Sequence, residues 1–199
     1  MPRPFLKKKS LTTQKLLGNM SVNCPTLQHI LKADECLENL AGISSTVYVG
    51  VKSDLEAPLV ATENNYSTPA FASGKGLYKI EAKNEAQKLA FSSLGPRKGF
   101  ELTLTVVIES LNKVFSKAGR ALNNLDLFFI VEDGEESLIM YDPQRRCEAE
   151  SGGIAGDTGD TADSDRQATC DFKLKPVKYP ILYVTKPATG GWDGLLASE

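Results

Sequence analysis

The chain has 199 residues, of which 41% are hydrophobic and 24% charged, and its formal net charge is −2 at pH 7. This composition is that of a folded chain, because disordered chains combine low hydrophobicity with high net charge. The small net charge excludes a global attraction to nucleic acid or membrane surfaces, and no apolar stretch is long enough for a transmembrane helix.

The charge is unevenly distributed along the chain. Residues 1–20 carry five basic side chains and no acid, whereas residues 131–165 carry eleven acids and two arginines. Two readings stay open: head-to-tail contacts between copies, or two solvated segments. No apolar segment of the length of a signal peptide follows the basic start, so we expect an intracellular protein at synthesis.

The first half of the chain predicts an arm followed by strands. Residues 1–40 show little periodicity and are predicted as an N-terminal arm. Alternating valines predict a strand over 46–51. The polar run 53–68 is too long for a tight hairpin and is a candidate functional loop. Residues 77–82 alternate again, and a short helix over 81–90 is left open as an alternative.

The clearest pattern is a strand, a helix and two further strands. Residues 100–109 alternate apolar with threonine or acid, and Ser110 is the predicted N-cap of a helix that ends at Asn123–Asn124. Strands are predicted over 125–132 and 137–141, joined by a turn at Asp133–Gly134. The side chains expected to pack in the core are those on one helix face and in the following strand: Leu111, Val114, Phe115, Ala118, Ala121, Leu122, Phe129 and Val131.

The last part of the chain predicts a loop, two strands and an arm. Residues 148–168 are rich in Gly, Asp, Thr and Ser and are predicted as a loop, followed by strands over 168–175 and 181–184. The domains are therefore an arm at 1–40, a β domain at 41–185 and an arm at 186–199. The single tryptophan, Trp192, needs a docking site or a patch on its own domain.

The predicted fold is mainly β. It consists of two packed antiparallel sheets, as a sandwich or half-barrel, flanked by one α-helix and by extended N- and C-terminal arms.

The cysteines and the single histidine, His29, give no motif of catalysis or metal binding. No C-x-x-C pair occurs, no nucleophile elbow lies near His29, and no phosphate-binding glycine fingerprint is present. The acids of 156–165 do not follow the order of a calcium loop. We therefore predict no catalytic residue, metal or cofactor, and four reduced cysteines packed mostly as small hydrophobic side chains: Cys24, Cys36, Cys147 and Cys170.

One segment carries a resemblance to a known family. Residues 100–141 combine the strand, the amphipathic helix, the run Gly119-Arg120-Ala121-Leu122-Asn123-Asn124-Leu125-Asp126-Leu127-Phe128-Phe129-Ile130-Val131-Glu132-Asp133-Gly134 and a returning strand. This order resembles the core of the tail tube (major tail) proteins of long-tailed bacteriophages, notably those of prophages in Bacteroides-like hosts. The likeness extends over about residues 41–185. Its other parts are Ala41-Gly42-Ile43 before Val47-Tyr48-Val49, the loop 151–165, and the strands at 169–174 and 180–184.

The resemblance implies a structural virion protein. Such proteins form hexameric rings whose inner sheets join into one β-barrel, and the rings stack into a tube through which DNA leaves the capsid. Implied partners are further copies of the chain, other tail proteins (tape measure, terminator, and baseplate or hub), and passing DNA without sequence-specific binding. The implied location is the virion tail, assembled in the host cytoplasm.

Under this hypothesis the loop 53–68 and both termini form ring-to-ring or subunit contacts. The candidate contact residues are Lys7, Lys8, Lys9, Asn64, Asn65, Tyr66 and Trp192. The three lysines are expected outside the channel, because a cationic wall would hold DNA phosphates. The alternatives are a single-ring tail terminator, neck or baseplate protein, a tube protein of a phage-like contractile injection system, and a small metal-dependent hydrolase using His29 and the acidic loop.

Overall fold

The computed structural model describes residues 42–109, 111–134, 136–159 and 166–198. The predicted N-terminal arm lies outside the described residues, and so do Lys7, Lys8, Lys9, Cys24, His29 and Cys36. Ser110, the predicted helix cap, lies outside them as well.

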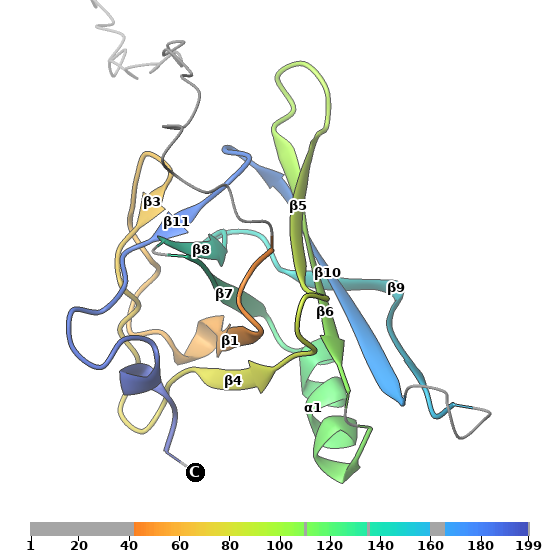
Figure 1. The fold of residues 1–199 in the computed structure, drawn as a ribbon. Coiled ribbons are helices and arrows are strands. Elements are labelled where there is room, and N and C mark those ends of the chain that lie inside the picture. The colour runs from red at the N-terminus through yellow and green to blue at the C-terminus, as the bar shows by residue number, and fades with distance from the viewer. Residues whose placement is uncertain (1–41, 110, 135, 160–165, 199) are drawn as a thin grey trace, which may run out of the picture. The chain divides into compact units, whose positions relative to one another are not determined.

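The described chain forms two sheets and one α-helix (Figure 1), which confirms the prediction of a mainly β fold with two sheets and a single helix. The larger sheet has seven strands, in the order β2 (Ala61–Thr62), β3 (Asn65–Tyr66), β11 (Tyr183–Val184), β8 (Glu136–Met140), β7 (Leu127–Asp133), β1 (Thr46–Val51) and β4 (Tyr78–Glu81). The smaller sheet has four, in the order β5 (Lys88–Ser93), β6 (Phe100–Ile108), β10 (Gln167–Val177) and β9 (Glu148–Asp157). The helix α1 (Lys113–Asn124) connects β6 to β7, and two short 3₁₀ helices cover Lys52–Asp54 and Asp193–Leu195.

The first hydrophobic core lies between the two sheets. Along β6 and β10 every second side chain is buried, so each strand contributes one apolar face. Phe129 of β7 meets Phe172 of β10 with ring centroids 4.4 Å apart. Phe129 and Val131 belong to this core, as predicted.

A second core covers the opposite face of the seven-stranded sheet. Tyr48, Phe128 and Ile130 point into it, and residues from the segments 55–77 and 179–195 pack over them. Strand β7 is therefore buried on both faces, which explains its uninterrupted apolar run from Leu127 to Val131.

The helix packs against the first core with only part of its apolar surface. Leu122 is buried, and Leu111 and Phe115 are half-buried. The prediction was wrong for Val114, Ala118 and Ala121, which are exposed, because the helix turns only one stripe toward the sheets. The N-cap is Asn112 rather than Ser110, since the Asn112 side-chain oxygen accepts a hydrogen bond from the Phe115 N–H at 2.9 Å.

Strand β9 replaces much of the predicted loop 148–168. Its pairing with β10 shifts register between Cys170 and Phe172. Gly152 has a φ of 79°, and a β-carbon on Gly153 would lie 2.7 Å from the Asp171 carbonyl oxygen. Glycine is therefore required where this edge strand bulges, and the same glycines made the segment look like a loop.

Two further stretches differ from the prediction. Residues 88–93 form the strand β5, so the alternative helix over 81–90 is wrong. The predicted loop 53–68 contains the β2–β3 hairpin, which extends the seven-stranded sheet through a parallel pairing of β3 with β11.

The C-terminal residues 186–198 pack onto the domain instead of extending as an arm. The Leu77 N–H donates to the Leu195 carbonyl at 2.8 Å, and the Ala197 N–H donates to the Leu77 carbonyl at 3.0 Å. Trp192 is 1% exposed and anchors the segment in the second core. The α-helix that the structure describes is too short and too polar to cross a bilayer.

Candidate functional site

The outer face of the four-stranded sheet carries a row of paired charges. The alternation that buries one face of β6 and β10 turns Glu101, Thr105, Asp171 and Lys173 to the other. Lys173 Nζ lies 3.2 Å from Glu101 Oε1, and the Thr105 hydroxyl donates to Asp171 Oδ1 at 2.6 Å. The face is polar, and its side chains contact one another across strands.

Two flanking residues complete the row of charges. Glu150 of β9 lies 2.7 Å from Lys173 Nζ, and Lys175 Nζ lies 2.9 Å from Glu101 Oε2. Hydrogen bonds from Lys175 and then Lys173 lower the pKa of Glu101, and hydrogen bonds to Glu150 and then Glu101 raise the pKa of Lys173. The row thus holds two lysines and two glutamates, whose formal charges cancel.

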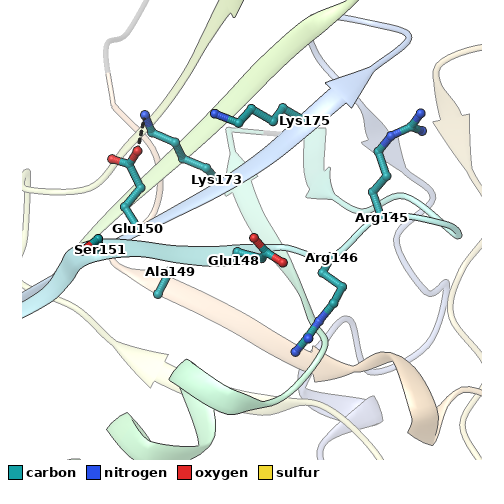
Figure 2. Close-up of a pocket in the computed structure, with 8 residues that line it drawn as sticks. All are labelled: Arg145, Arg146, Glu148, Ala149, Glu150, Ser151, Lys173 and Lys175. Carbon is teal, nitrogen blue, oxygen red and sulfur yellow. Dashed lines mark ion pairs between the residues drawn. The ribbon is translucent and has the colours of Figure 1, made fainter.

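A hollow of about 450 Å³ lies at the β9 side of this face (Figure 2). Its lining residues are Arg145, Arg146, Glu148, Ala149, Glu150, Ser151, Lys173 and Lys175.

The basic groups of this hollow do not converge on one point. Arg145 and Arg146 point in different directions (Figure 2). Arg145 Nη1 pairs with Asp142 at 3.4 Å, and Arg146 Nη2 donates to the Asn124 carbonyl at 3.2 Å. The hollow therefore lacks the geometry of an anion cradle. Its single hydroxyl, on Ser151, has no histidine beside it in the lining.

The four-stranded sheet is open at both edges in the described part of the chain. Strand β5 pairs only with β6, and the ten-residue β9 pairs only with β10. The edges of the seven-stranded sheet are shorter, since β2 has two residues and β4 has four. Long unpaired edges are templates for further strand pairing, whereas very short edge strands resist it.

A second hollow, of about 230 Å³, lies beside β5 and is called the β5 hollow below. Its lining is mainly apolar and comes from both sheets and their connections: Gly42, Ile43, Gln87, Lys88, Leu89, Phe91, Asp133, Leu138, Pro180 and Ile181. Phe91 is 53% exposed at this place, which is unusual for a large aromatic side chain.

The predicted contact residues fall into different environments. Asn65 is exposed, while Asn64 is half-buried and accepts a hydrogen bond from the Tyr183 N–H at 2.8 Å. Tyr66 lies in the second core, where its ring meets Tyr141 edge-on with centroids 5.2 Å apart. The Trp192 indole N–H donates to the Ser137 hydroxyl at 3.0 Å.

The prediction that Tyr66 and Trp192 form contacts between subunits is therefore wrong. Both side chains are buried inside their own domain. Of the predicted contact residues that the structure describes, only the two asparagines keep side-chain surface. The paired charges were missed, although polar residues at every second position of 101–105 and 171–175 pointed to them.

The two described cysteines are packing residues. Cys147 and Cys170 are buried in the first core, as predicted for reduced cysteines. Burial raises the pKa of the Cys147 thiol to about 12 and that of Cys170 to about 11, so neither is a thiolate at neutral pH. The described residues hold no cluster of three or more His, Cys, Asp or Glu placed to bind a metal.

The proposed hydrolase site cannot be assembled from what is described, since His29 and residues 160–165 of the acidic loop lie outside it. Comparison of the chain with protein-family models, curated proteins and solved structures finds no match.

Proposed function

We propose that this protein is a structural subunit of a phage-like tail tube, which forms stacked hexameric rings around a channel for DNA. The observation that carries the proposal is the four-stranded sheet, which combines two long open edges with a polar, charge-balanced outer face. The resemblance of residues 41–185 to tail tube proteins supports the same reading.

The edges supply a means of ring closure. Pairing β5 of one copy with β9 of the next would continue the sheet from subunit to subunit. Because β5 and β9 are different surfaces, this contact is heterologous, and it closes into a ring when the rotation between copies allows. The bulge at Gly152–Gly153 divides β9, so pairing would use the residues on one side of it.

The outer face suits a channel for DNA. Lys173 and Lys175 pair with neighbouring carboxylates, so these two lysines are not free cations that would hold phosphates. In this proposal the protein also binds other tail proteins. It is located in the virion tail after assembly in the host cytoplasm.

The first experiment is negative-stain electron microscopy of the full chain over a concentration series. Stacked rings or tubes with a central channel are expected. Single closed rings that never stack would favour a terminator, neck or baseplate protein. Monomers at every concentration, confirmed by light scattering, would contradict the proposal.

A second experiment tests which face lines the channel. Thr103→Lys combined with Thr169→Lys adds two cations to the outer face of the four-stranded sheet, because both side chains point away from the first core. The assembled variant is expected to retain a fluorescent oligonucleotide at low salt and release it at high salt. Ala61→Lys with Thr62→Lys, on the exposed β2, is the matched control. If the outer-face variant retains no more oligonucleotide than the control, the outer face of the four-stranded sheet does not line the channel.

A further inference from the structure

We propose that the exposed apolar side of α1 is the contact surface for a second copy of this chain, which receives it in the β5 hollow. The inference rests on the proposed function and names the side chains that would join neighbouring subunits beyond the strand edges.

The helix leaves a stripe of apolar side chains uncovered. Val114, Ala118, Ala121 and Leu125 are spaced by four, three and four residues and therefore share one side of the helical segment. Val114 is 73% exposed and Leu125 is 43% exposed. The neighbouring stripe, with Leu122, is the one that packs against the sheets. We call the exposed set the helix stripe.

The β5 hollow has the size and lining of a receptor for such side chains. Its volume of about 230 Å³ far exceeds the roughly 30 Å³ that one water occupies in the liquid. Leu89, Phe91 and Ile181 contribute apolar walls. Covering exposed apolar walls of this kind with an aliphatic side chain removes them from water, which lowers the free energy of the complex.

The two surfaces lie at opposite edges of the same sheet. Helix α1 contacts β9, whereas the hollow is lined by β5. Both also lie on the core side of the four-stranded sheet, since Leu122 and Leu89 pack with the first core. The helix stripe of one copy therefore cannot reach the hollow of the same copy, but a neighbour whose β9 pairs with β5 brings its helix to that side. The helix stripe and the strand pairing thus serve one heterologous contact.

The charges beside the two surfaces are complementary. Helix α1 carries Lys113, Lys117 and Arg120 without an acid, and the described residues supply them with no ion pair. The β5 hollow includes Asp133, which opens the β7–β8 turn and is followed by the exposed Glu136. Lys88 is the one basic residue of the lining. Opposite charges at the rim would orient the encounter, while the apolar contacts hold it.

Disulfide trapping tests the juxtaposition. Full-length chain with Cys24→Ser and Cys36→Ser receives Val114→Cys and Phe91→Cys, and the buried Cys147 and Cys170 stay in place. Mild oxidation is expected to give a ladder of covalent oligomers on a non-reducing gel. Val114→Cys with Val60→Cys is the matched control, because Val60 is 71% exposed but lies in the loop before β2. The control should give no ladder.

A charge placed in the helix stripe tests its contribution to assembly. Val114→Asp would bring a carboxylate into the apolar hollow and is expected to weaken association, measured by analytical ultracentrifugation, at least about tenfold. Ser116→Asp is the control, since this exposed residue lies in the same turn of α1 but outside the stripe. Circular dichroism establishes that both variants fold.

The outcomes separate this inference from the proposed function. If rings form, but the Val114–Phe91 pair gives no ladder and Val114→Asp assembles as well as Ser116→Asp, the helix contact is overturned and the ring proposal stands. If the unmodified chain does not associate at any concentration, both are overturned.

Discussion

Replacing Trp192 by alanine is the most direct test of how the C-terminal segment is held. The indole is 1% exposed in the second core, lies beside Tyr48 with ring centroids 6.4 Å apart, and donates a hydrogen bond to Ser137. The substitution removes the largest side chain among the fully buried ones of the described chain. The backbone bonds between Leu77 and residues 195–197 then lose their neighbouring anchor.

The expected effect follows from buried area and from the hydrogen bond. A buried tryptophan removes about 150–250 Å² from water, which at about 25 cal/mol/Å² corresponds to roughly 4–6 kcal/mol. Alanine keeps a small part of this, and measured losses for such truncations are about 3–5 kcal/mol. We therefore expect the free energy of unfolding to fall by about 3–5 kcal/mol, out of the roughly 5–15 kcal/mol typical of a domain.

The measurement is urea unfolding followed by far-UV circular dichroism, because Trp192 is the only tryptophan and tryptophan fluorescence is lost with it. The control is Leu196→Ala, a partly exposed neighbour in the same segment. Trp192→Phe separates the two contributions, because it keeps most of the apolar area but leaves the Ser137 hydroxyl without its donor. A loss from Trp192→Ala no larger than that of a surface substitution, about 0.5 kcal/mol, would refute the anchoring role.

Four further predictions concern two glycines, a buried cysteine and a buried tyrosine. Gly50→Ala should destabilise the fold by at least about 1–3 kcal/mol in urea unfolding, because its β-carbon would lie 2.1 Å from the Phe128 ring. Gly119→Ala, on α1, should leave stability unchanged or higher, because the new carbon would have no neighbour within 4 Å beyond the adjacent residues and the nearby helix backbone. Cys147 should resist alkylation in the native protein and react after unfolding, as mapped by mass spectrometry, and rapid native labelling would contradict its burial. Burial raises the pKa of Tyr48 from 10.0 to about 12, so the stabilisation by its protonated hydroxyl is complete below pH 10 and is lost as pH rises toward 12. In Tyr48→Phe this part of the alkaline loss, followed by circular dichroism, should disappear.

The central strands could be predicted from sequence because their burial pattern appears directly in the residue types. Alternation of Leu102, Leu104 and Val106 with polar residues marks a strand with one buried face. The run at Leu127–Val131 marks a strand buried on both faces. Local composition was sufficient in these places because each strand lies beside long neighbours in the middle of a sheet.

The edges and the helix face could not be predicted in the same way. Strand β9 is polar and contains Gly152 and Gly153, so its strand character depends on pairing with β10, which local composition does not reveal. The helix period identifies an apolar side, but it does not say how much of that side the sheets cover. Val114 was therefore assigned to the core together with Leu122, although only Leu122 is buried.

Trp192, near the C-terminal end of the chain, shows most clearly what residue spacing cannot predict. Trp192 lies among glycines, and its neighbours in sequence predict a free segment. Its burial comes from contacts with Ser137 and Tyr48, which are 55 and 144 positions away along the chain. Such non-local contacts leave no periodic signal in the sequence, so a lone aromatic side chain indicates a docking site without saying where it is.

The two faces of the four-stranded sheet also limit how this protein can associate. One face is already covered by the first core. The other carries Lys173 between Glu101 and Glu150, and burying these ion pairs in a dry interface would remove their hydration without new partners. Stable growth through either face is thus unfavourable, and the proposed association uses the edges β5 and β9 with their adjoining apolar surfaces instead. An assembly built through those edges keeps the charged face in contact with water, and in a closed ring that face can line an aqueous channel.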